Sequence, residues 1–508
     1  MLGMKIFNHK ILKEHPLEGQ EQLELLCEGI MHTLPADGSF IGNNTLKKYL
    51  ATSMRISDEL YKSAVHKLGY EGLIRTGGGR GGSVALITAS PQHQVSVHPL
   101  QGAESTTFQS LCLYAEGTQG KKGGSWDTKP RQVSLFDEEA IPRFGEVNAP
   151  FLTDQIITYI GNKRSLLPFI GNGLNKIKNK LNKHRITSFD VFSGSGIVAR
   201  YMKDFSDSIS TCDLELYSAI INSCYLSNVS SLDINLIKKW IDQANDEGIN
   251  NPIEGIITKF YAPEDDANIK IGERVFYTKR NAMFIDTARM VIENAPSDIK
   301  NHLLAPLLYV ASVHANTSGV FKGFYKNSKT GIGQFGGNGK NALVRICKPF
   351  NIPYPIFSET ETNFRVYQGD SNQLAKEHSH VDVAYIDPPY NQHPYGSNYF
   401  MLNVIANNEM PPVISEISGI PENWNRSDYN IKAKTKAALF DLASNIDAKY
   451  LLISFNSEGY ITKDEMLDML ALVGKTEVLE TTYNTFRGSR NLENRDIYVT
   501  EYLFLVEK

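Results

Sequence analysis

A β-rich run that leads into a glycine turn and then a helical pattern most constrains how this chain can fold. Residues 186–192 favour a strand, 193–196 (Ser-Gly-Ser-Gly) form the turn, and 197–202 follow with helical periodicity. This order is typical of the first strand-to-helix turn of a doubly wound, mostly parallel sheet. The glycines let a ligand approach the backbone, although a tight turn without a ligand has the same pattern.

The turn does not continue into the motifs of the common nucleotide-binding folds. The position of the third glycine in Gly-x-Gly-x-x-Gly is Ala199, and no pyrophosphate-binding lysine follows. This argues against a nicotinamide cofactor and against a P-loop. The next strand-like run, 209–212, ends at Asp213, whose carboxylate can accept hydrogen bonds from both hydroxyls of a ribose. An adenosine-containing cofactor without a diphosphate fits these residues.

Further strand signals complete the expected sheet. Parallel strands are predicted at 364–367, 381–386 and 450–455, and a closing antiparallel pair at 477–482 and 497–506. Ligands of such sheets bind at the carboxyl ends of the strands, and both Asp213 and Asp387 follow a predicted strand directly.

A carboxylate, two prolines and an aromatic ring follow the apolar run 381–386: Asp387, Pro388, Pro389 and Tyr390. The carboxylate and the carbonyl of Pro388 can both accept hydrogen bonds from one amino group, and Tyr390 can stack on the flat base that carries it. An Asp-Pro-Pro run is also an ordinary way to end a strand and begin a turn.

Four elements in this order resemble the Dam-type adenine-specific DNA methyltransferases, which use S-adenosylmethionine. They are residues 159–163, the glycine turn, Asp213 and residues 387–390. The resemblance covers roughly residues 150 to 508 and implies a class I methyltransferase fold, which is Rossmann-like α/β. It implies cofactor-binding roles for Tyr159, Lys163, Phe192, Gly194, Gly196, Asp213, Asp370 and Asp387, and catalytic roles for Asp387, Pro388, Pro389 and Tyr390. Tyr159 stands where the family often has tryptophan, and for Asp370 a plain turn is equally compatible.

Methylation of an adenine amino group requires the base to leave the duplex stack. We expect direct transfer of the methyl group, without a covalent enzyme intermediate and without a metal. Cytosine-5 methylation is disfavoured because no cysteine follows a proline. Methylation of the cytosine amino group (N4), methylation of RNA and a catalytically silent DNA-binding regulator stay open as alternatives.

An insertion from 233 to 348 lies between the cofactor residues and the catalytic loop. It mixes basic, aromatic and glycine residues, which suit phosphate contact and stacking. In the Dam-type order the target-recognition region lies here. The expected DNA-binding residues are Lys322, Lys326 and Lys340, with Arg345 nearby, and Arg487 and Arg490 in the connection between the last two strands. Solvated basic loops are the alternative.

The first 88 residues are expected to form a winged-helix-like domain. Helices are predicted at 20–34, 44–51 and 57–68, and a two-stranded wing at 73–76 and 83–87 with Arg80 at its tip. Such a domain binds DNA or docks a protein partner. Residues 89–150 are predicted to be a flexible linker, and 151–508 the methyltransferase domain.

Composition predicts a soluble, cytoplasmic enzyme, and the resemblance to Dam-type enzymes implies that it belongs to a prokaryotic cell or is encoded by a phage. The five cysteines form no Cys-x-x-Cys pair, and no apolar stretch is long enough to span a membrane. The net charge of −4 requires any contact with duplex DNA to come from local basic patches. A cognate restriction endonuclease is a possible partner; the recognition sequence and the oligomeric state are left open.

Overall fold

The computed structural model of the protein describes residues 149–340, 342–484 and 498–508, with short stretches and single residues between 26 and 86. The chain divides into two compact units, Met1–Gln132 and Val133–Lys508, each described here by itself. The division falls inside the stretch 89–150 that the sequence predicts to be a linker. Arg80, Arg487 and Arg490 lie outside the described residues.

Three short strands form an antiparallel sheet in the first unit. They are β1 (Ile41–Gly42), β2 (Ile74–Gly77) and β3 (Ser83–Leu86), in the order β1-β3-β2. β2 and β3 make the hairpin that the sequence predicts. The helical residues of this unit that the structure describes as buried fall within the three predicted helices: Leu26, Cys27, Ile30, Leu46, Tyr61, Ala64 and Leu68. The Cys27 thiol donates to the carbonyl oxygen of Ala64, which joins the first of these stretches to the third.

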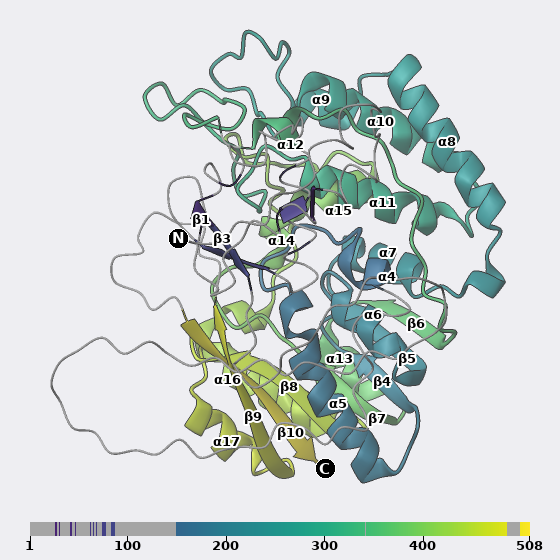
Figure 1. The fold of residues 1–508 in the computed structure, drawn as a ribbon, viewed down its shortest axis with the longest axis vertical. Helices are drawn as coiled ribbons and strands as arrows, with labels where there is room; N and C mark the ends of the chain where they lie inside the picture. Colours follow the sequence, from purple (N-terminus) through teal and green to yellow (C-terminus); the bar gives the residue numbers. More distant parts are fainter. Residues whose placement is uncertain are drawn as a thin grey trace, which may run out of the picture. The chain divides into compact units, whose positions relative to one another are not determined.

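Seven strands form one sheet in the second unit, in the order β6-β5-β4-β7-β8-β10-β9 (Figure 1). β6, β5, β4, β7 and β8 run parallel, and β10 is antiparallel to both β8 and β9. The bounds are β4 Ile186–Asp190, β5 Ser206–Asp213, β6 Asn363–Gln368, β7 Val381–Ile386, β8 Ala448–Asn456, β9 Lys475–Asn484 and β10 Tyr498–Glu507. This is the doubly wound, mostly parallel sheet with a closing antiparallel hairpin that the sequence predicts.

Helices cover both faces of this sheet, because successive side chains of a strand point to opposite sides. Val383 and Tyr385 of β7 belong to one core, and Ala384 and Ile386 to another. The first core contains α5 (Leu167–Leu181), α6 (Ile197–Lys203) and α7 (Leu216–Tyr225). The second contains α13 (Ser371–Glu377), α16 (Lys432–Asn445) and α17 (Lys463–Leu470). Burial on both faces explains why β7 is an uninterrupted buried run.

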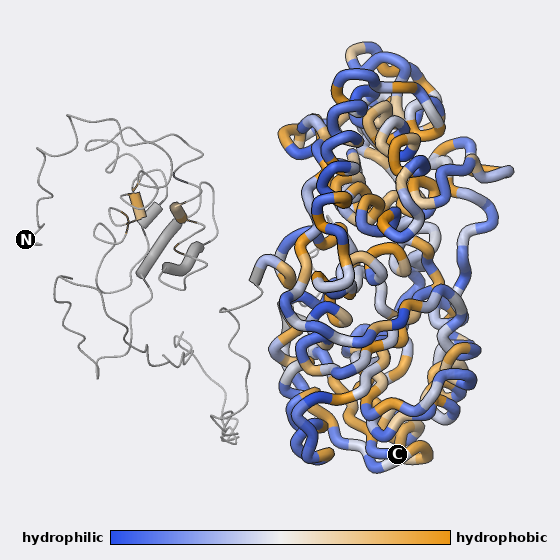
Figure 2. The backbone as a smooth tube through the Cα atoms, turned by 90° about the vertical axis from the view of Figure 1, so that its right-hand side faces the viewer, coloured by the Kyte–Doolittle hydropathy of each residue, from blue (hydrophilic) through white to orange (hydrophobic). Residues whose placement is uncertain are grey.

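The helices of the inserted region extend the first core. They are α8 (Ile234–Asn250), α9 (Ile256–Tyr261), α10 (Lys279–Glu293) and α11 (Lys300–Val313), and α11 packs against α7. Figure 2 shows apolar stretches both near the C-terminus and at the far end of the second unit, as a shared core requires. A long connection then leads to α12 (Leu343–Cys347).

Arg200 on α6 fixes the segment that follows α4 (Ala149–Thr153). Its guanidinium donates to the carbonyl oxygens of Phe151, Asp154 and Gln155, at 3.0 to 3.1 Å. It also lies 3.5 Å from the centre of the Tyr225 ring. Only 1% of Arg200 is exposed, so water does not compete for these bonds.

Short elements complete the second unit: η1 (Arg164–Leu166), η2 (Val229–Ser231), α14 (Tyr395–Asn398), α15 (Phe400–Asn407) and η3 (Asp428–Asn430). Among the described residues, every helix is too short or too polar to cross a membrane.

Candidate active site

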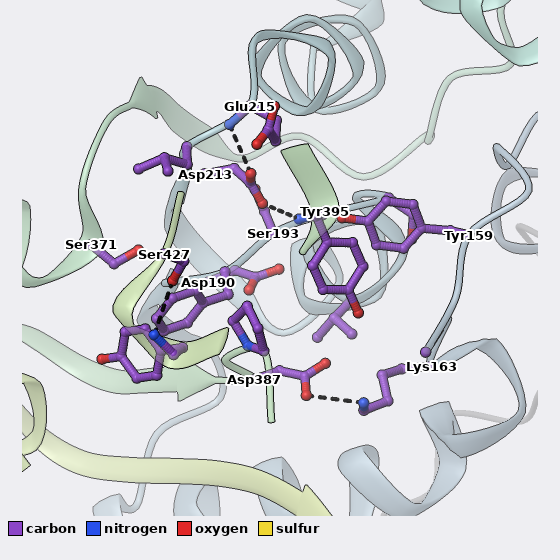
Figure 3. Close-up of a pocket in the computed structure, with 18 of the residues that line it drawn as sticks. Tyr159, Lys163, Asp190, Ser193, Asp213, Glu215, Ser371, Asp387, Tyr395 and Ser427 are labelled. Carbon is purple, nitrogen blue, oxygen red and sulfur yellow. Dashed lines mark hydrogen bonds and ion pairs between the residues drawn. The ribbon is translucent and has the colours of Figure 1, made fainter. Parts of the chain in front are cut away.

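A pocket opens at the carboxyl ends of β4, β5 and β7, where the strand order changes direction (Figure 3). It contains about 880 Å³ of space without protein atoms, part of it open to solvent. Most of the predicted site residues line it: Tyr159, Lys163, Phe192, Gly194, Asp213, Asp370, Asp387 and Pro389. Gly196 instead caps α6 behind the turn, and Pro388 is buried.

The glycine turn has a left-handed backbone, with φ of +46° at Gly194 and +76° at Gly196. The Ser193 amide donates to the carbonyl oxygen of Cys212 at 2.9 Å, which ties the turn to β5. A Cβ on Gly194 would lie 3.0 Å from Cε1 of Tyr159. Glycine is therefore required here both for the backbone conformation and for the close approach of the tyrosine.

Asp213, at the end of β5, braces the turn. Its Oδ2 accepts from the Gly194 amide at 2.8 Å, and its Oδ1 from the Glu215 amide at 2.9 Å. Burial raises the pKa of Asp213, and these backbone bonds offset only part of the increase. Each carboxylate oxygen has two acceptor positions, so both can still accept a bond from a ligand hydroxyl.

Asp190, the last residue of β4, was not among the predicted site residues, although it precedes the turn. It is 1% exposed and lines the pocket, between Asp213 and Asp387 in the view of Figure 3. Among the described residues, neither of its carboxylate oxygens has a hydrogen-bond partner of normal geometry. Burial raises its pKa well above the ordinary value, and the charges of Asp387 and Asp213 raise it further. The amides of Phe192 and Ala199 offset part of this.

Five carboxylates line the pocket, those of Asp190, Asp213, Glu215, Asp370 and Asp387. They suit a positively charged ligand, because a buried carboxylate is stabilised by an opposite charge. Within the described part of the chain, no group of three or more His, Cys, Asp or Glu side chains is arranged to hold a metal ion. The positive charge of an organic ligand would match the buried carboxyl group of Asp190.

Lys163 and Asp387 form a buried ion pair, with Nζ and Oδ1 2.9 Å apart and side chains 4% and 16% exposed. Burial acts to lower the pKa of Lys163, but the charge of Asp387 raises it well above the ordinary value. Burial raises the pKa of Asp387, and Lys163 offsets part of that rise. The lysine thus favours the ionised, hydrogen-bond-accepting form of Asp387.

Tyr390 lies next to this pair but does not line the pocket itself. The Lys163 ammonium is 5.4 Å from the centre of its ring. The Tyr390 ring packs edge-on against the Phe455 ring, with the ring centres 5.6 Å apart. The backbone carbonyl oxygen of Tyr390 accepts a hydrogen bond from the Tyr460 amide. These contacts hold the catalytic loop against β8.

Tyr159 takes part in an aromatic stack. Its ring lies 4.9 Å from that of Tyr395 and 4.6 Å from that of Tyr399, nearly parallel to both. The hydroxyl of Tyr399 accepts from the Ile160 amide, and that of Tyr395 donates to the Ile160 carbonyl oxygen. The segment carrying Lys163 is therefore clamped to the chain that follows the catalytic loop, a link that the sequence did not indicate.

One wall of the pocket comes from a segment that sequence reasoning missed, residues 421–431, which we call the strap. Its pocket-lining residues are Asn425, Ser427, Tyr429 and Asn430. The Tyr429 ring packs edge-on against Phe192 at 5.1 Å, and its hydroxyl donates to Asn372. The strap carries no periodic pattern; its Asn and Ser content was the available signal.

The predicted Asp370 caps α13, accepting from the Gln373 amide at 3.0 Å, and lines the pocket beyond Phe192. The cap agrees with the local turn, and the position in the pocket leaves the predicted cofactor contact of Asp370 as a prediction.

Of the predicted DNA-binding residues, Lys322, Lys326 and Lys340 are exposed on the connection 314–342. Arg487 and Arg490 lie outside the described residues. Arg345 is unsuited to phosphate contact, because its guanidinium donates to the carbonyl oxygens of Val313, Ala315 and Thr317 and so fixes the connection from inside.

A seven-stranded sheet in this order, with a pocket for an adenosine-sized ligand at its glycine turn, defines a class I methyltransferase. Comparison with known families takes the identification further. Residues 159–469 match the family described as D12 class N6 adenine-specific DNA methyltransferase, and the chain belongs to that family.

Three curated relatives are DNA methyltransferases or modification methylases by name, in agreement with this family. The chain is 30% identical over 363 residues to the type II methyltransferase M.NlaIII of Neisseria lactamica, covering 69% of this chain and 99% of the relative. It is 30% identical over 357 residues to M.CviAII of Paramecium bursaria Chlorella virus 1, covering 69% and 98%. Modification methylase StsI of Streptococcus sanguinis is 27% identical, with 52% of its length matched.

The protein is therefore an adenine-specific DNA methyltransferase that uses S-adenosylmethionine as methyl donor. This decides between the alternatives that the sequence left open. The acceptor is the adenine amino group and not that of cytosine, the substrate is DNA and not RNA, and the chain is an enzyme and not a silent regulator.

Proposed function

We propose that the protein methylates N6 of an adenine flipped out of duplex DNA, with Asp387 and the Pro388 carbonyl as acceptors for the amino group. One observation carries the proposal: Asp387 lines the same pocket as the glycine turn and Asp213. Both substrates thus meet at one carboxylate. Tyr390, immediately beyond, offers a ring on which the extruded base stacks.

The residues of the pocket fit the cofactor. S-Adenosylmethionine, when bound, supplies an electrophilic methyl group on a positively charged sulfonium. Asp213 accepts from the ribose hydroxyls with its remaining acceptor positions. Asp190, unpaired among the described residues, pairs with the cationic methionine end. Phe192 and Tyr429, which pack edge-on against each other, would hold the adenine ring, and Asp370 would accept a hydrogen bond from its amino group. Tyr159 and Lys163 close the opposite side.

Chemistry at the amino group rests on positioning and electrostatics. Lys163 keeps Asp387 ionised, so that its carboxylate draws the nitrogen lone pair out of conjugation with the ring. Asp387 is also placed to receive the proton that leaves as the nitrogen is methylated. Its pKa is raised by burial, which makes it a better proton acceptor than an exposed aspartate.

The rest of the chain serves DNA recognition in this proposal. Residues 233–348 form the target-recognition region, in which the exposed Lys322, Lys326 and Lys340 contact phosphates. Residues 1–88 act as a winged helix on the same DNA, a role that the β2–β3 hairpin and the buried helical residues support. The type II relatives suggest a restriction-modification system with a cognate endonuclease.

The test is expression in a bacterium without DNA methylation, followed by sequencing that reports modified bases. We expect N6-methyladenine in one short motif, lost in the isosteric variant Asp387→Asn. The matched control is Asp447→Asn, an exposed aspartate at the opposite end of the sheet. Unchanged methylation by Asp387→Asn would remove Asp387 from the mechanism.

A further inference from the structure

The strap (residues 421–431) is held by a cluster of side chains outside the catalytic loop. Asn425 donates from Nδ2 to the Leu214 carbonyl oxygen and to Oε2 of Glu215, both at 3.2 Å. The same Oε2 accepts from Nδ2 of Asn403, on α15, at 2.5 Å. Three segments distant in sequence thus meet on one carboxylate.

Glu215 is only 3% exposed, and its environment is built around these two amides. A buried carboxylate is unfavourable unless hydrogen bonds satisfy it. Asn403 is itself fixed, since its Oδ1 accepts from the Tyr217 amide at 3.1 Å. The amide side chain of Asn403 therefore orients Glu215, and Glu215 orients Asn425.

A glycine lets the strap approach the chain that follows the catalytic loop. A Cβ on Gly396 would lie 2.4 Å from the carbonyl oxygen of Asn425 and 3.0 Å from its amide nitrogen. At its other end, the strap bonds through Nδ2 of Asn430 to the carbonyl oxygen of Asn391, next to Tyr390. The strap thus spans from the cofactor side of the pocket to the catalytic loop.

We propose that Asn403 and Glu215 are positioning residues for the cofactor, which act through Asn425 to seat the strap as a wall of its pocket. The proposal rests on the cofactor site assigned above. Glu215 and Asn425 line that pocket and Asn403 does not, so a change at Asn403 acts on the cofactor only indirectly.

The experiment measures binding of S-adenosylhomocysteine to the full-length protein by calorimetry, without DNA. Loss of one hydrogen bond to a charged group predicts that Asn403→Ala raises the Kd about tenfold. Glu215→Ala is expected to do the same, while Glu215→Gln, which keeps an acceptor oxygen, recovers most of the affinity. Asn407→Ala, exposed one turn further along α15, is the matched control and is expected to bind like wild type.

Kinetics separate positioning from a structural role. We expect Asn403→Ala to raise the KM for S-adenosylmethionine about tenfold while kcat at saturation changes less than about twofold. A fall in kcat at unchanged KM would indicate a loss of folded enzyme and overturn the proposal. So would equal Kd values for Asn403→Ala and Asn407→Ala. If the wild-type protein itself fails to bind S-adenosylhomocysteine, the cofactor site is wrong, and the inference fails with it.

Discussion

Replacing Lys163 with methionine leaves Asp387 buried without its cationic partner, and we expect this to lower both stability and activity. Methionine keeps the long aliphatic stem, so the packing beside Tyr390 changes little. Because the two side chains are 4% and 16% exposed, water replaces only part of the lost interaction.

The size of the effect follows from the separation. Two unit charges 2.9 Å apart attract with about 6 kcal/mol at an effective dielectric constant of 20. Removing one member of a buried pair typically costs about 3–5 kcal/mol. Since Asp387 is partly exposed and can take up a proton, we expect Lys163→Met to lose about 2–4 kcal/mol of unfolding free energy at pH 8.

The loss depends on pH in a definite direction. Burial already raises the pKa of Asp387, and removing Lys163 raises it further. A carboxyl group whose folded-state pKa lies above its unfolded value contributes stability at low pH that is lost as pH rises through the folded-state pKa. The deficit of Lys163→Met is therefore small near pH 4 and grows as Asp387 ionises.

Urea unfolding of wild type, Lys163→Met, Asp387→Asn and the double variant at pH 5 and 8 measures this directly. The double variant has no unpaired charge, so it should be more stable than Lys163→Met alone at pH 8. Equal stability of these two proteins at pH 8, or an equal deficit of Lys163→Met at both pH values, would refute the reasoning.

Three further predictions concern other parts of the molecule. Burial raises the pKa of Glu215 to about 7. Its favourable contribution to the unfolding free energy of the wild-type protein is therefore lost as pH rises from about 4.5 to 7. Relative to wild type, Glu215→Gln should gain about 3 kcal/mol in unfolding free energy between pH 4 and pH 8. Equal pH dependence of the two proteins would contradict this. Gly194→Ala should lose about 1–2 kcal/mol and also bind S-adenosylhomocysteine more weakly, because its Cβ meets Tyr159. Gly272→Ala, with φ of +92° and open space around it, carries the backbone strain alone and should keep the affinity. Lys326→Ala should lower the slope of log K against log salt for DNA binding by about 1; Lys449→Ala, exposed at the start of β8, should leave it unchanged.

The strands were predictable because burial on both faces favours a mainly apolar run, as in β7, in which Asp382 is the one charged residue. The ends of the strands were harder to predict than the strands themselves. β5 was expected at 209–212 but begins at Ser206, because Ser206 is buried and hydrogen-bonds through its hydroxyl to Ser188. A polar side chain satisfied inside a sheet leaves no hydrophobic signal.

The pocket was predictable where a motif marks it, as at Gly194, Asp213 and Asp387. The strap and Glu215 were missed because their roles depend on which distant segments fold together, as the pairing of Glu215 with Asn403 and Asn425 shows. Arg345, which lies close to the expected DNA-binding lysines in the sequence, illustrates a related point. Its guanidinium donates to carbonyl oxygens inside the protein. The sequence around such an arginine does not differ from that around an arginine that binds phosphate.

The bonds from Arg200 to the carbonyl oxygens of Phe151, Asp154 and Gln155 isolate the catalytic unit mechanically. A displacement of the chain ahead of Phe151 is therefore resisted by these bonds before it reaches the segment that carries Tyr159 and Lys163. We therefore expect that fusing another module ahead of residue 149 leaves the pocket unchanged.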